Sequence, residues 1–97
     1  MNARYILEGR QPNPVDDVIQ WARWFETADR RVARTDLPGG VEVSTVFLGL
    51  DHSFGLAKTP ILFETMVFGG KYDQYEERYA TWEEAEEGHS RAVAMVT

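Results

Sequence analysis

The chain has 97 residues, of which 43% are hydrophobic and 12% aromatic, so it holds enough apolar material for one domain spanning residues 1–97 and none to spare for a second. It contains no cysteine, which excludes disulfides, thiolate chemistry and cysteine-type zinc sites. The net charge is −6, and an acidic surface repels phosphates, so we expect no direct binding to nucleic acid or to an anionic membrane.

The N-terminal part of the chain predicts one strand and one helix. Residues 4–9 predict a short strand, which ends in a turn at residues 11–14. Asn13 and Pro14 are the residue types of an N-cap and a first helical position, and the predicted helix continues to about Thr27. Apolar residues at helical spacing predict its buried stripe; they are Val15, Val18, Ile19, Ala22 and Phe25.

Four more strands and a second helix follow. Strands are expected at residues 31–36, 43–50, 61–68 and 75–80, with a glycine turn at 38–40 and a connection at 53–60. Thr81 and Glu84 have the spacing of a capping box and predict a helix that runs to about Val96. The order β-α-β-β-β-β-α predicts an α+β fold, in which a mostly antiparallel meander sheet has two helices packed on one face.

The long hairpin at residues 41–70 is apolar on both faces, whereas a sheet with one wet face alternates apolar and polar residues. The helices cover one face, so the other needs a partner or the long loop. A two-fold homodimer is the simplest cover. The predicted contact residues are Trp21, Trp24, Leu48, Phe54 and Met66.

An acidic segment near the C-terminus favours a second hypothesis, an inhibitor that mimics nucleic acid on a host protein. Its seven acids are Asp73, Glu76, Glu77, Glu83, Glu84, Glu86 and Glu87. The same pattern is typical of a solvated face that keeps a small protein dissolved.

Three residues carry a third hypothesis, a small metal-assisted enzyme. His52, Glu64 and His89 form the only set suited to metal binding or acid–base work, although their spacing matches no metal motif. If Leu50 pairs with Leu62, His52 and Glu64 share a face, and a slip of one residue separates them.

Structural roles for these residues are the stronger interpretation. We expect the His52 ring to bond to its loop, Asp51 to cap that turn, and His89 to be a packed histidine. Glu64 is expected to pair with an arginine near the end of the first helix. The protein is accordingly predicted not to be an enzyme, and we expect no catalytic residue, metal or cofactor.

Four blocks of the sequence together resemble a family. The blocks are WARWFE at Trp21–Glu26, VSTVFLGLDHSF at Val43–Phe54, LFETMVFGG at Leu62–Gly70 and RYATWEEAEEGH at Arg78–His89. They are similar to a small family of uncharacterised proteins from tailed bacteriophages, prophages and some bacteria. The resemblance implies a phage or prophage origin and expression in the bacterial cytoplasm, and it implies no activity.

No apolar stretch reaches the ~18 residues of a membrane span, and the N-terminus lacks the apolar core of a secretory signal, which also favours a cytoplasmic protein. The favoured interpretation is a non-enzymatic protein–protein interaction module of phage or prophage origin that forms a homo-oligomer.

Overall fold

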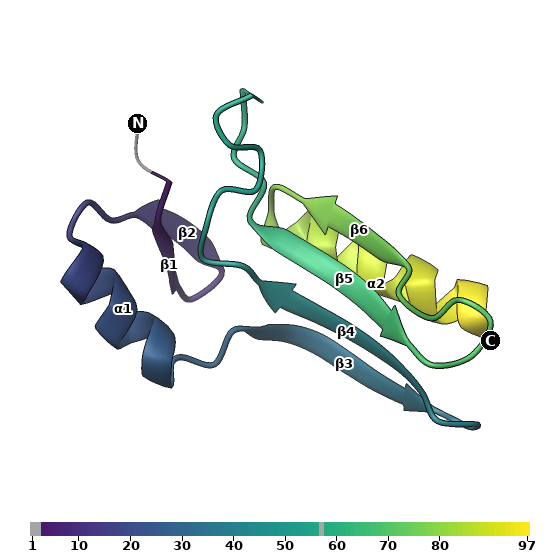
Figure 1. Cartoon of the computed structure of the whole chain (residues 1–97). Coiled ribbons are helices and arrows are strands. Elements are labelled where there is room, and N and C mark those ends of the chain that lie inside the picture. The colour runs from purple at the N-terminus through teal and green to yellow at the C-terminus, as the bar shows by residue number, and fades with distance from the viewer. Residues whose placement is uncertain (1–2, 57) are drawn as a thin grey trace.

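The computed structural model describes residues 3–56 and 58–97 and shows an α+β fold (Figure 1). The described elements are β1 (Tyr5–Glu8), β2 (Gln11–Pro14), α1 (Val18–Thr27), β3 (Arg31–Leu37), β4 (Val41–Phe47), β5 (Phe63–Phe68), β6 (Glu76–Tyr79) and α2 (Trp82–Val96). Strands β1 and β2 form a small sheet, and β3 to β6 form a larger one in chain order with every pair antiparallel. The prediction of an α+β fold with an antiparallel meander is confirmed.

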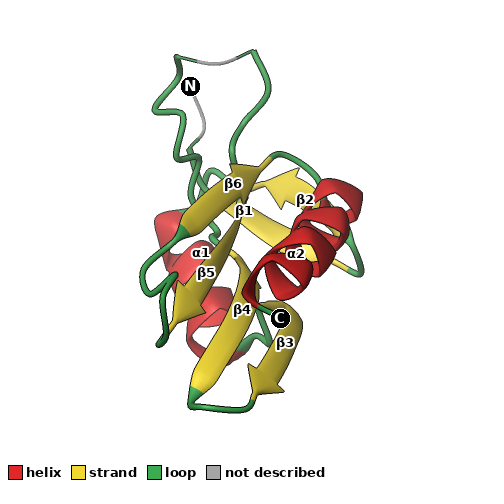
Figure 2. Ribbon diagram, turned by 90° about the vertical axis from the view of Figure 1, so that its right-hand side faces the viewer, coloured by secondary structure: helices red, strands yellow, loops and turns green. Residues whose placement is uncertain are grey.

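Helix α2 begins where the sequence predicts. The Thr81 hydroxyl oxygen accepts the backbone N–H of Glu84 at 3.1 Å, and the Glu84 carboxylate accepts the backbone N–H of Thr81 at 3.1 Å. This reciprocal pair is the capping box, and it satisfies two of the donors that a helix start leaves free. The helix contacts all four strands of the larger sheet and lies over one of its faces (Figure 2).

The core lies between α2 and one face of the larger sheet. Alternate residues of β4 and β5 point toward the helix and are fully buried, because successive side chains of a strand point to opposite faces. These residues are Val43, Thr45, Phe47, Phe63, Thr65 and Val67. Burying each large apolar side chain stabilises the fold by roughly 1.5–3 kcal/mol.

Helix α1 starts later than the sequence predicts. Asp17, and not Asn13, is the N-cap, and its carboxylate accepts the N–H groups of Ile19 at 2.9 Å and Gln20 at 3.2 Å. Residues 11–14 instead form β2, which pairs with β1. Prolines are tolerated there because an edge strand has N–H positions that no neighbour needs.

The position of α1 also differs from the prediction. Figure 1 shows α1 beyond the end of the larger sheet, near the start of β3, and it packs against β1. Trp21, Trp24 and Phe25 are partly buried, whereas Val18 is 53% and Ile19 61% exposed. Of the predicted stripe, Phe25 is partly buried and Val15 is buried but precedes the helix, whereas the other three members are exposed. Trp21, Trp24 and Phe25 set the buried side of the helix, because aromatic side chains offer more apolar surface.

The connection between β4 and β5 is fixed at its base by Asp51. The Asp51 carboxylate accepts the backbone N–H groups of Ser53 at 2.8 Å and Ile61 at 2.9 Å. Burial raises the pKa of Asp51, but these hydrogen bonds outweigh it and hold the pKa below its ordinary value of 3.8. The loop projects past the end of the larger sheet (Figures 1 and 2), so it does not cover the face opposite α2.

Candidate protein-binding surface

The face of the larger sheet opposite α2 is called the open face. Three rows of paired residues cross it: Arg31, Val46, Glu64 and Arg78; Arg34, Ser44, Met66 and Glu76; Asp36, Glu42 and Phe68. Helix α2 lies behind the sheet in Figure 1, so that view is onto the open face. None of the open-face residues of the two central strands is buried, in contrast to their neighbours that face α2.

Large apolar side chains lie on the two central strands of the open face. Val46 and Met66 are half-buried, and Phe68 is 44% exposed. Leu48 directly follows β4 and is also half-buried. Since apolar area removed from water is worth roughly 25 cal/mol per Å², a partner that covers these side chains gains stability.

Charged side chains stand on the β3 edge of the open face. The Arg34 guanidinium lies 3.1 Å from the carboxylate of Glu42 and 3.3 Å from that of Asp36. All three groups are partly exposed, and such pairs contribute roughly 0–1 kcal/mol each. These ion pairs satisfy the charged groups that border the apolar side chains, even when no partner protein is bound.

The β6 edge repeats this arrangement. The Arg78 guanidinium donates to the Glu64 carboxylate at 2.8 Å and lies 3.6 Å from Glu76. The hydrogen bond to Glu64 raises the pKa of Arg78 above its ordinary value. Glu64 therefore has the predicted arginine partner, although the arginine comes from the neighbouring strand and not from the end of α1.

Trp21 and Trp24, both predicted contact residues, have roles inside the molecule. The Trp21 indole N–H donates to the carbonyl of Gly49 at 3.0 Å. Trp24 packs edge-on against Phe47, with ring centroids 5.8 Å apart. Both residues are half-buried and join α1 to the rest of the fold.

The other predicted contact residues fall on two separate surfaces. Met66 lies on the open face and Leu48 at its end, whereas Phe54 is on the projecting loop. Phe54 is 80% exposed and has a positive φ of 52°, and Leu56 beside it is 92% exposed. A non-glycine residue with positive φ is uncommon.

The seven predicted acids do not form one face. Glu76 and Glu77 are adjacent in β6 and point to opposite sides of the sheet. Glu77 accepts a hydrogen bond from Arg91 at 2.6 Å, which holds the pKa of Glu77 below its ordinary value of 4.5. Glu84 is engaged in the capping box. This dispersal does not favour the nucleic-acid mimic.

His52, Glu64 and His89 do not come together. Glu64 is on the open face, while His89 lies on the α2 side and contacts Thr45, which points away from the open face. Within residues 3–56 and 58–97 there is no group of three or more side chains placed to hold a metal ion. A sheet separates two members of the trio, so the hypothesis of a metal site built on all three is wrong.

The structural roles expected for the two histidines and for Asp51 are confirmed. The His52 Nδ1 lies 2.9 Å from the carbonyl oxygen of Leu50, at the base of the loop. His89 is buried and both of its ring nitrogens have hydroxyl partners.

Sequence reasoning missed the two ion-paired arginines among the three arginines of the open face, Arg34 and Arg78. The register of the central hairpin also differs from the one considered, in which Leu50 pairs with Leu62. Strands β4 and β5 pair with Phe47 opposite Phe63, a shift of two residues, and such a shift leaves every side chain on its expected face. The sequence did contain a signal for Arg34. Charges at alternate positions, as in Arg34-Thr35-Asp36, are typical of an edge strand with one solvated face.

A scan of protein-family models and searches of curated proteins and solved structures found no match to this chain. The relationship to phage proteins thus stays a prediction. In the described part of the chain, neither helix has the length and apolar character needed to cross a bilayer.

Proposed function

We propose that this chain is a non-enzymatic protein-interaction module of phage or prophage origin, and that its partner is a second copy bound through the open face. The observation that carries the proposal is that Val46 and Met66 are only half-buried and Phe68 is exposed. These apolar side chains lie on the two central strands of the open face, and neither strand has a buried residue on that side. An apolar centre with a charged border is the usual composition of a protein interface.

A second copy suits the charges of this face. The face carries three arginines and four acids, so it is neither strongly basic nor strongly acidic. A two-fold axis parallel to the strands sets the β3 edge of one copy against the β6 edge of the other. Each edge offers one paired arginine and its acids, Arg34 on β3 and Arg78 on β6, so opposite charges can meet across the contact.

The geometry of a sheet-on-sheet dimer is compatible with these side chains. Two sheets pack face to face about 10 Å apart, which leaves room for one interdigitated layer of side chains. A stable interface buries on the order of 1,200 Å² or more in total. This chain reaches that area if the contact covers both the central rows and the charged edges of its four-stranded sheet.

Sedimentation equilibrium from micromolar to millimolar concentration tests the dimer. The wild-type protein is expected to reach about twice the 11.1 kDa mass of one chain. Met66→Lys places a charge at the centre of the open face and should yield a monomer that keeps its fold by circular dichroism. Ala94→Lys, an exposed position on α2, adds the same charge elsewhere and should leave the dimer intact.

A single 11.1 kDa wild-type species at millimolar concentration would contradict the proposal. An unchanged dimer in Met66→Lys would also contradict it, because the contact would then lie elsewhere on the molecule.

A further inference from the structure

The loop between β4 and β5 ends in an exposed apolar turn. The backbone N–H of Leu56 donates to the carbonyl of Ser53 at 3.0 Å. The two residues between them, Phe54 and Gly55, have positive φ angles of 52° and 80°. These are the angles of a type I′ turn, in which asparagine or glycine is the usual first central residue. Phe54 therefore carries backbone strain at the tip of the loop, and such strain clusters at functional sites.

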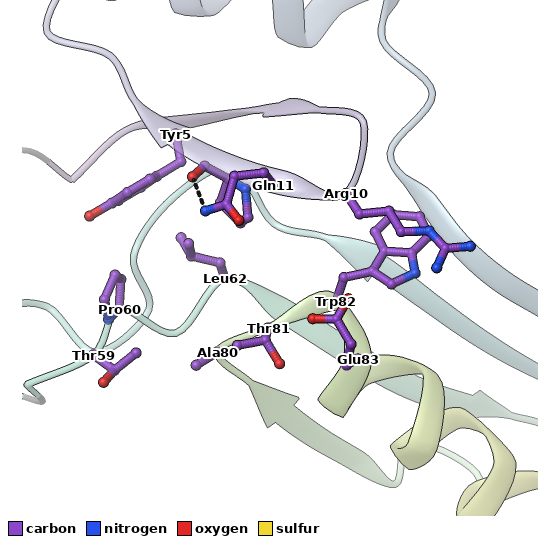
Figure 3. Close-up of a pocket in the computed structure, with 11 residues that line it drawn as sticks. Tyr5, Arg10, Gln11, Thr59, Pro60, Leu62, Ala80, Thr81, Trp82 and Glu83 are labelled. Atoms are coloured by element: carbon purple, nitrogen blue, oxygen red, sulfur yellow. Dashed lines mark hydrogen bonds between the residues drawn. The ribbon is translucent and has the colours of Figure 1, made fainter.

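The chain itself does not cover this turn, since Phe54 and Leu56 are both largely exposed. A pocket of about 240 Å³ lies at the base of the loop, between the β1–β2 hairpin, the chain just before β5 and the start of α2 (Figure 3). Thr59 and Pro60 of the loop line this pocket, but Phe54 and Leu56 do not. The two large side chains of the turn are therefore available to another molecule.

The dimer proposed above brings two such loops to the same place, and this step rests on that proposed function. A two-fold axis parallel to the strands preserves the strand direction, so both loops project from the same end of the dimer. The loop joins the two central strands of the larger sheet, β4 and β5, so its base lies beside that axis. Figure 2 shows the loop above the strands and away from α2. Because packed sheets lie about 10 Å apart, the side chains of the two loops can meet.

The charges of the loop permit this contact. Residues 53–56 carry no charge, and residues 52–60 contain one lysine and no acid, although the net charge of the chain is −6. The Asp51 carboxylate at the base already accepts the backbone N–H groups of Ser53 and Ile61. Two loop tips can therefore meet without removing a charged group of residues 53–56 from water.

We infer that the loop tips of the two copies pack against each other across the two-fold axis, so that Phe54 and Leu56 of each copy are buried by those of the other. This contact adds apolar burial to that of the open faces, and paired aromatic rings attract each other further. The predicted contact residues then share one interface. Met66 lies on the open face, Leu48 lies at its end, and Phe54 extends the contact beyond the sheet.

Disulfide cross-linking tests the inference, because the chain contains no cysteine of its own. Under mild oxidation, Leu56→Cys should link two copies about tenfold faster than Pro38→Cys, since the dimer holds the two loop cysteines at high effective concentration. Pro38 is also exposed, but it lies in the turn between β3 and β4, and the two-fold axis places these turns on opposite edges of the dimer. When Met66→Lys is added to disrupt the open-face dimer, the rate for Leu56→Cys should fall to that of Pro38→Cys.

A second variant measures the contribution of the ring. Phe54→Asn removes the ring and keeps the turn, because Asn-Gly is a preferred pair in a type I′ turn. Its dimer dissociation constant, measured by sedimentation equilibrium, should rise about tenfold, since both copies lose buried apolar area. Ala94→Asn introduces the same residue at an exposed position of α2 and should leave the constant unchanged.

The outcomes separate this inference from the proposed function. If the protein is a dimer but Leu56→Cys links no faster than Pro38→Cys, the inference is overturned and the proposed function stands. An unchanged dissociation constant in Phe54→Asn has the same meaning. A wild-type protein that stays monomeric at millimolar concentration overturns both.

Discussion

His89 lies between α2 and the larger sheet, with both ring nitrogens held by threonine hydroxyls. Its Nδ1 is 2.7 Å from the Thr45 hydroxyl oxygen and its Nε2 is 2.9 Å from that of Thr35. The Thr45 hydroxyl also contacts Thr65 in the next strand. His89 is 6% exposed, and this burial lowers its pKa below the ordinary value of 6.5 because the charged form loses its hydration.

The stability of the protein should therefore depend on the protonation of His89. The unfolded chain takes up this proton first as the pH falls, since its pKa is the higher one. The contribution of neutral His89 is thus complete above pH 6.5 and is lost as the pH falls from 6.5 toward the folded pKa. Urea unfolding on both sides of pH 6.5 should show this loss in the wild type and a flatter profile in His89→Gln.

The His89→Gln variant should also be less stable at neutral pH, by roughly 1–3 kcal/mol, because buried hydroxyl groups lose a partner. An identical pH dependence in the two proteins would assign the effect to other groups.

How well the sequence predicts the role of a residue depends on how far along the chain its hydrogen-bond partners lie. The structural roles of His52 and Asp51 follow from near neighbours, since their partners are Leu50, Ser53 and Ile61. The hydroxyl partners of His89 are 44 and 54 residues away. No local pattern identifies them, because they depend on which strand lies under the helix.

Among the secondary-structure elements, α2 packs closely against β6 at Gly88, which is buried. A methyl group at this position would overlap the ring and hydroxyl of Tyr79 in β6. Glycine costs roughly 1 kcal/mol in a helix relative to alanine. At Gly88 the absence of a side chain allows the helix to approach β6 closely, which offsets this cost.

Gly88→Ala should consequently destabilise the protein although alanine is the better helix former. Overpacking of this kind costs roughly 1–3 kcal/mol, and thermal or urea unfolding measures it. In a Tyr79→Leu background the same change should cost less, because the overlapping ring is gone. A more stable Gly88→Ala single variant would mean that the helix shifts freely over β6.

The two helix starts show which element boundaries the sequence can predict. The capping box of α2 spans four residues and forms through local hydrogen bonds alone, so the pattern identifies it. At α1 the Asn13-Pro14 signal is overridden by the pairing of β2 with β1. The Asn13 side chain bonds to the Glu8 carboxylate at 2.8 Å, which engages its amide in the hairpin.

For the molecule as a whole, the arginines are dispersed. Arg30 donates to the carbonyl of Phe47 at 3.0 Å and lies over the ring of Phe25. Arg34 is paired with two acids. Arg10, Arg78 and Arg91 each lie within 4 Å of a carboxylate as well, and the net charge of the chain is −6, so the charges do not favour a basic patch.

The protein should accordingly fail to retain duplex DNA even below ~0.2 M salt, because it lacks a cluster of cations to release counterions. An electrophoretic mobility-shift series over salt concentration measures this. Tight binding that weakens steeply with salt would show that the arginines of α1 and β3 converge in solution.

The carbonyl of Gly49 accepts two hydrogen bonds, from the backbone N–H of Tyr5 at 2.9 Å and from the indole of Trp21 at 3.0 Å. One peptide group thus fastens both the first strand and the first helix. In the language of native-state hydrogen exchange, we expect β1 and α1 to belong to one cooperative opening unit. Their amides should share a common protection level that is lower than that of the amides of β4 and β5, which lie in the core.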